Sequence, residues 1–150
     1  MAKHQLSITR LGKRVPVNKA KMRKTVHTVL DAEEIVEWEI SLVFVDNPTI
    51  HRLNILYLDH DEPTDVLSFP LSEPGSKKLV GELIIGAEVA QTEAAARGHD
   101  LHAELALYVI HGLLHLCGYD DKSKSSAKVI RERERHYLKT LSLPDISPKT

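Results

Sequence analysis

The fold of this chain depends on residues 101–121, which read LHAELALYVIHGLLHLCGYDD. Apolar residues fall on almost every side of the helix predicted for residues 101–117, and a helix that is apolar all round is buried. Asp100 is a suitable N-cap, and Gly118 can take the left-handed backbone conformation that ends a helix. We therefore expect a central buried helix against which the rest of the chain packs.

Hydrophobic periodicity predicts the elements around this helix. Strands are expected over residues 5–9, 38–45, 66–70 and 79–85, and helices over residues 19–33, 47–57, 88–97 and 122–141. The order β-α-β-α-β-β-α-α-α predicts an α/β (α+β) fold in which a mixed sheet of about four strands is packed by helices. Pro70 should end the third strand or confine it to an edge, because proline has no N–H to donate.

Length and composition predict one folded domain over residues 1–150. The chain is 42% hydrophobic and 27% charged, which is ordinary for a globular domain and excludes a disordered chain. The segment 142–150 contains Pro144 and Pro148 and is expected to be a frayed tail. A net charge of −1 gives no overall attraction to nucleic acid, so such binding would need a local basic patch or a metal.

Cysteine content and hydropathy predict the compartment. Cys117 is the one cysteine, which excludes an intrachain disulfide and a disulfide-stapled secreted scaffold. The N-terminal residues lack the apolar stretch of a signal peptide, and no apolar run approaches the roughly 20 residues that span a bilayer. We expect a cytoplasmic protein without a membrane partner.

Two histidines of the central helix form a candidate metal site. His111 and His115 are four residues apart, so both imidazoles project from one helix face. A turn at Gly118 would bring Asp121 to the same place. Two imidazoles and a carboxylate leave a fourth tetrahedral position open, as in catalytic zinc sites. We predict one zinc ion bound by His111, His115 and Asp121, with Asp120 as the alternative carboxylate.

Two alternatives to this hypothesis remain open. The histidines could be hydrogen-bonded core residues beside a glycine that ends the helix, because a buried imidazole needs a polar partner. Their spacing also matches the H-x-x-x-H-x-x-G-x-x-H pattern of metzincin proteases, with Asp121 as the third ligand. Gly112, however, stands where H-E-x-x-H enzymes carry their general base. A glycine within a helix also indicates that another backbone or a substrate approaches closely there.

A second polar stretch precedes the third predicted strand. Pro63, Thr64 and Asp65 are consistent with an ordinary turn before that strand. Alternatively, Asp65 or Thr64 orients a metal-bound histidine, since such imidazoles usually donate their second N–H to a carboxylate or carbonyl. Asp65 is therefore our candidate catalytic residue.

Three stretches resemble the YbeY endoribonucleases, also described as rRNA maturation factors. They are LNxxY at residues 53–57 with PTDVLSFP at 63–70, GELII at 81–85, and HGLLHLCGYD at 111–120. The resemblance implies a bacterial, zinc-dependent, single-strand-specific endoribonuclease. It implies a role in maturing the 3′ end of 16S rRNA and in ribosome quality control, with RNA and the small ribosomal subunit as partners.

The chain departs from this family at two positions. The family usually has a third histidine where this chain has Asp121, which removes one positive charge from the site. It commonly has an arginine after the tyrosine, where this chain has Leu58, so a cation that could hold phosphate is missing. Basic residues at 19–24 or in the last helix are candidates for holding the RNA backbone. A metalloprotease and a non-catalytic assembly factor with a structural zinc are the competing functions.

Overall fold

The computed structural model describes residues 3–12, 14–58 and 66–148. Its strands are β1 (His4–Arg10), β2 (Glu37–Val45), β3 (Val66–Pro70) and β4 (Lys78–Gly86). Its helices are α1 (Lys19–Ala32), α2 (Asn47–Leu58), α3 (Ala87–Arg97), α4 (Leu101–Leu116) and α5 (Lys124–Thr140). Every predicted element is present, and each end lies within two residues of its expected position.

The strands form one mixed sheet in the order β1-β2-β4-β3. The β1–β2 and β2–β4 pairs are parallel, and β3 runs antiparallel to β4. The predicted α/β fold with a sheet of about four strands is confirmed. Pro70 ends β3 at the edge of the sheet, as its missing N–H requires.

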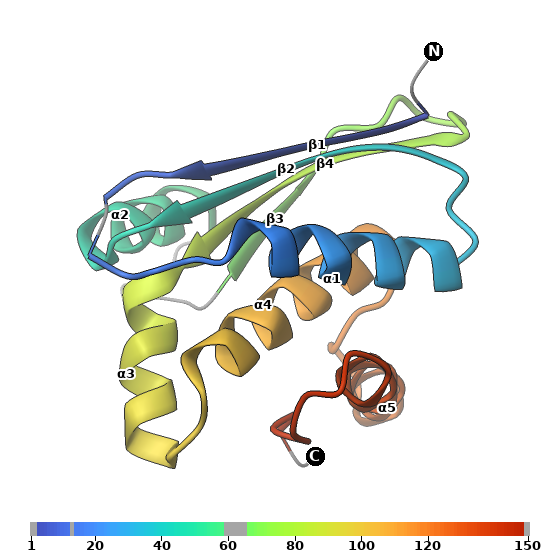
Figure 1. Ribbon diagram of the computed structural model, residues 1–150. Helices are drawn as coiled ribbons and strands as arrows, with labels where there is room; N and C mark the ends of the chain where they lie inside the picture. The colour runs from blue at the N-terminus through green and yellow to red at the C-terminus, as the bar shows by residue number, and fades with distance from the viewer. Residues whose placement is uncertain (1–2, 13, 59–65, 149–150) are drawn as a thin grey trace.

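The sheet buries one face more extensively than the other. Figure 1 shows α1, α4 and α5 on the same side of the sheet. The main core on this side takes alternate residues of β2, namely Trp38, Ile40, Leu42 and Phe44. Successive strand residues point to opposite faces, and α2 covers the second face with a smaller cluster, formed by Val45, Ile50, Leu67 and Ile84.

Helix α4 is the central element predicted from its all-round apolar pattern. Twelve of its 16 residues are buried. The Asp100 carboxylate accepts a hydrogen bond from the Ala103 N–H and caps the first turn. The helix ends where Gly118 takes a φ of +105°, a value that favours glycine, and the chain then turns back toward the helix.

Gly112 lies where α4 packs closely on the side chains of the sheet. A Cβ atom at this position would lie 2.9 Å from Leu83 Cδ2 and 3.2 Å from Val66 Cγ2. The close approach expected from the sequence is therefore real. However, the atoms that approach belong to side chains of β4 and β3, and neither a backbone nor a substrate is required to explain the glycine.

The prediction of a frayed tail needs correction over residues 142–148. No helix or strand forms there, yet Ile146 and Ser147 are each only 7% exposed. Leu143 also packs against the main core. The segment forms no further helix, but the apolar side chains of Leu143 and Ile146 still hold it against the core. Among the described helices, none is long and apolar enough to cross a membrane.

Candidate metal centre

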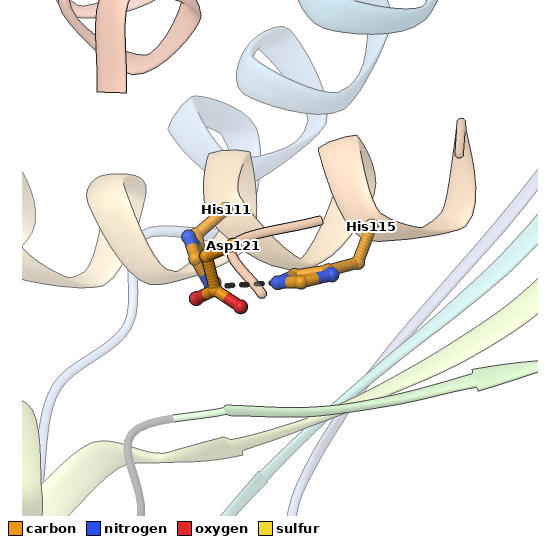
Figure 2. A group of neighbouring side chains, drawn as sticks. All are labelled: His111, His115 and Asp121. Atoms are coloured by element: carbon orange, nitrogen blue, oxygen red, sulfur yellow. Dashed lines mark hydrogen bonds and ion pairs between the residues drawn. The ribbon is translucent and has the colours of Figure 1, made fainter. Parts of the chain in front are cut away.

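Three polar side chains converge where α4 ends. His111 and His115 project from one face of α4, and the turn after Gly118 returns Asp121 to them (Figure 2). One ligand atom from each residue lies within 4.8 Å of the other two. The two Nε2 atoms are 2.9 Å apart, and Asp121 Oδ2 lies 4.0 Å from His111 Nε2. The structure thus brings together the three residues expected from the sequence.

The chemistry and spacing of these atoms fit a zinc ion. Two imidazole nitrogens and one carboxylate oxygen are the protein ligands of many catalytic zinc sites. With Zn–N bonds of about 2.0–2.1 Å, two nitrogens on one tetrahedral ion lie roughly 3.3 Å apart. The observed separation of 2.9 Å needs only a small change in side-chain torsions. Among the described residues, this is the one cluster of at least three His, Cys, Asp or Glu suited to a metal.

Burial favours the neutral form of His115, which is the form that can bind a metal. Burial, together with the neighbouring His111, keeps the pKa of His115 below its ordinary value despite the nearby carboxylates. A neutral imidazole has a free lone pair, whereas a protonated one must release its proton before it binds a metal.

His111 is anchored from behind by Glu134 of α5. The His111 Nδ1 atom lies 2.6 Å from Glu134 Oε2, and the Glu134 side chain is fully buried. Arg131 Nη1 donates to both carboxylate oxygens at 3.0 and 2.8 Å, and Ser147 Oγ donates to Oε1 at 2.7 Å. Burial would raise the pKa of Glu134, but the hydrogen bond and charge of His111, with Ser147 and Arg131, lower it below its ordinary value.

A second polar cluster holds the turn that carries Asp121. Tyr119 donates to Glu33 Oε1 at 2.9 Å, and Arg133 Nη2 donates to Glu33 Oε2 at 2.6 Å. Tyr137 also donates a short hydrogen bond to Glu33 Oε2. Burial would raise the pKa of Glu33, but these three donors lower it. Cys117, at the end of α4, is mostly buried beside this cluster, and burial raises its pKa to about 12.

Two cavities border the three candidate ligands and share His111. The first, of about 340 Å³, lies beneath β3 and is lined by Val66, Leu67, Ser68, Phe69, Pro70, His111, His115 and Leu116. The second, of about 480 Å³, lies toward α3 and α5, with a lining that includes Arg97, Glu104, His111, Asp121, Arg131 and Pro148. The site is therefore open to a ligand on both sides.

Other predicted site residues have different outcomes. Asp65 and its alternative, Thr64, lie outside the described residues. Asp120 is exposed, its Oδ1 accepts a hydrogen bond from the Lys122 N–H, and it is not part of the three-residue cluster. The basic residues of α1 do not line either cavity next to the candidate ligands, whereas Arg131 of the last helix lines the second.

Glu134, Arg131 and Ser147 were not identified from the sequence. One signal could have found Glu134. It belongs to the buried face of α5, at helical spacing with Ile130, Tyr137 and Leu138. A carboxylate at such a position must be paired, and it is therefore a marker of a buried polar contact.

The sequence of this chain is similar to those of known proteins over most of its length. A family model described as Endoribonuclease YbeY matches residues 7–142. The chain is 37% identical over 137 residues to the Endoribonuclease YbeY of Aquifex aeolicus, covering 90% of this chain and 91% of that protein. It is 43% identical over 124 residues to the Endoribonuclease YbeY of Salinibacter ruber, covering 78% of this chain and 79% of the relative.

A solved structure has a similar fold. The solution structure of a protein from Thermotoga maritima matches with a TM-score of 0.60 and 23% sequence identity, over 97% of this chain and 100% of that chain. That likeness concerns the fold, whereas the family model and the relatives match by sequence over most of the chain. The chain belongs to the YbeY endoribonuclease family.

Proposed function

We propose that this chain is a zinc-dependent endoribonuclease that cleaves single-stranded RNA during maturation of the 3′ end of 16S rRNA. The proposal places it in the cytoplasm, at the small ribosomal subunit. The observation that carries it is the convergence of His111, His115 and Asp121 between two cavities that open to solvent. Membership in the YbeY family supports RNA as the substrate.

In this proposal, His111, His115 and Asp121 hold one zinc ion, with a further position left for water or substrate. A zinc ion held by these residues would supply Lewis-acid chemistry, polarising a phosphodiester and favouring the deprotonation of water near neutral pH. The two imidazoles are neutral ligands, and Asp121 contributes one negative charge. The site therefore keeps a net positive charge toward a phosphodiester.

In this proposal, the side chains of the two cavities contact different parts of the RNA. The cavity beneath β3 offers the apolar side chains of Leu67 and Phe69, and bases of single-stranded RNA stack on aromatic rings. The second cavity is lined by Arg97, which also pairs with Glu93, and by Arg131, whose Nη1 contacts Glu134. The remaining N–H groups of these two guanidinium groups are therefore the donors for phosphate oxygens. Arg131 thus supplies a cation near the metal in a chain whose position 58 carries leucine where the family commonly has arginine.

The competing functions have less support. A metalloprotease of the H-E-x-x-H kind would need a general base where this chain has Gly112, and the Gly112 position is packed against Leu83 and Val66. A structural zinc would have a closed set of four protein ligands, whereas the cluster of described residues supplies three.

Removal of the metal should abolish RNA cleavage. We expect dialysis against a chelator to remove about one zinc ion per chain and to stop cleavage of a single-stranded RNA, and re-addition of zinc to restore it. Zinc content by mass spectrometry and cleavage by gel electrophoresis measure both effects. Cleavage of casein, and not of RNA, by the zinc-loaded protein would instead support the metalloprotease.

Asp121 and Asp120 form a matched pair for identifying the carboxylate ligand. We expect Asp121→Asn to weaken zinc binding by at least about tenfold, because the amide oxygen is a poorer ligand than a carboxylate. Asp120→Asn should change zinc affinity less than about twofold, since Asp120 lies outside the cluster and its Oδ1 accepts a hydrogen bond from the Lys122 N–H. Competition with a chromophoric chelator measures both constants. The reverse pattern would identify Asp120 as the ligand.

A further inference from the structure

The segment that follows α5 turns back and ends beside the candidate metal centre. The Leu143 N–H donates to the Leu138 carbonyl at 2.8 Å, which reverses the chain at the end of the helix. Ile146 then joins the main core, and Ser147 becomes 93% buried at the level of Glu134. We call residues 143–148 the C-terminal strap. The strap places the Ser147 hydroxyl against the carboxylate of Glu134, which lies 13 positions earlier in the sequence.

The contact between Ser147 and Glu134 belongs to a chain of hydrogen bonds that reaches His111. Ser147 Oγ donates to Glu134 Oε1 at 2.7 Å, and Glu134 Oε2 lies 2.6 Å from His111 Nδ1. An ionised carboxylate can only accept hydrogen bonds, so the proton of the second contact belongs to His111 Nδ1. The His111 Nε2 atom, 2.9 Å from His115 Nε2 and 4.0 Å from Asp121 Oδ2, is then the ring nitrogen that faces the other two candidate ligands.

Two further side chains donate hydrogen bonds to the Glu134 carboxylate. Glu134 is fully buried, and Arg131 Nη1 lies between its two oxygens at 3.0 and 2.8 Å. Ser147 is the donor that contacts Oε1 from the side of the strap. Without that hydroxyl, Arg131 is the one remaining donor to Oε1 among the described residues, and the carboxylate is held less firmly in the orientation that contacts His111.

We propose that Glu134 and Ser147 are positioning residues for His111, so that the C-terminal strap is a working part of the metal centre. The inference rests on the proposed metal-binding function, and neither residue is itself a ligand. Carboxylates behind metal-bound histidines fix the ring orientation and tautomer and raise ligand basicity. Here Glu134, the carboxylate behind His111, is itself held by Ser147, which lies in a segment without helix or strand.

Zinc affinity of the full chain tests the proposal, with zinc alone as the probe and a chromophoric chelator as competitor. We expect Glu134→Gln to weaken zinc binding by about 10- to 100-fold, the range for loss of a partner behind a ligand. Ser147→Ala should weaken it by about fivefold, the effect of one typical hydrogen bond. Ser142→Ala is the matched control, because Ser142 lies just before the strap and is exposed. It should bind like the wild type.

A spectroscopic readout separates positioning from general loss of structure. Long-range 1H–15N spectra of the zinc-free protein should show His111 protonated on Nδ1 in the wild type. In Glu134→Gln, the form protonated on Nε2 should become populated, while circular dichroism stays unchanged. Circular dichroism identifies a variant that fails to fold. If Glu134→Gln does not fold, the zinc affinity and the His111 spectrum of Ser147→Ala, which keeps the carboxylate, are compared with those of the wild type.

The outcomes distinguish this inference from the function on which it rests. If the wild type binds zinc and both variants bind it equally well, the inference is overturned and the proposed metal centre stands. If the wild type itself binds no zinc, the metal centre and the inference fall together. Weaker binding in both variants, with normal binding in Ser142→Ala, supports the strap as part of the site.

Discussion

His115→Ala should lower the rate of RNA cleavage by about 10²- to 10⁴-fold. The substitution removes one of the three proposed ligands, and a catalytic metal supplies several kcal/mol of transition-state stabilisation. Each 1.36 kcal/mol corresponds to a factor of ten in rate. Single-turnover cleavage of a single-stranded RNA measures the loss, and zinc content measured on the same sample should fall in parallel.

His102→Ala is the matched control for this experiment. His102 lies on the same helix, is partly buried like His115, and does not belong to the three-residue cluster. We expect its cleavage rate to stay within about twofold of the wild type. Unchanged cleavage by a well-folded His115→Ala protein would rule out the proposed zinc site as the catalytic centre.

Glu33→Gln should lower the free energy of unfolding at pH 7 by roughly 2–4 kcal/mol. Glu33 accepts hydrogen bonds from Tyr119, Tyr137 and Arg133, and its side chain is only 9% exposed. Breaking a buried ion pair by removing one partner typically costs about 3–5 kcal/mol, and the lower range applies because Arg133 is 34% exposed. Denaturation by urea measures the difference.

The effect of Glu33 should depend on pH in a defined direction. The pKa of Glu33 is lower in the folded state than its ordinary value of 4.5. The ionised carboxylate therefore stabilises the folded protein fully at pH values above 4.5. This contribution is lost as the pH falls through the lowered folded-state pKa. The difference between wild type and Glu33→Gln should therefore shrink on acidification below about pH 4.5. Glu132→Gln changes an exposed carboxylate of α5 and should cause little change at any pH.

Local patterns in the sequence were sufficient to predict the elements and the three clustered side chains. His111, His115 and Asp121 lie within eleven residues, and their approach to one another follows from helical periodicity and from the turn at Gly118. The strand and helix ends are similarly local, because Asp100, Gly98 and Pro70 each act on their own element. The path of the chain in three dimensions was not needed for these predictions.

The features that were missed depend on contacts between distant segments. The composition of residues 142–148 does not reveal that Ser147 donates a hydrogen bond to Glu134. Nor does it reveal that Glu134 contacts His111, which lies 23 positions before Glu134. The same holds for Gly112, whose neighbours Leu83 and Val66 come from two different strands. Sequence periodicity predicts that such positions are buried, but it does not identify the partner.

Cys117 has a consequence for how the metal centre can be studied. Its thiol is the only sulfhydryl of the chain, it sits two residues after His115, and its pKa of about 12 keeps it protonated at neutral pH. Oxidants and alkylating reagents attack the thiolate, so this sulfur should be chemically inert under ordinary conditions. We therefore expect zinc titrations of this protein to give the same affinity in air with and without a reductant that does not bind zinc, so that dithiothreitol, whose own sulfurs would compete for the ion, can be left out.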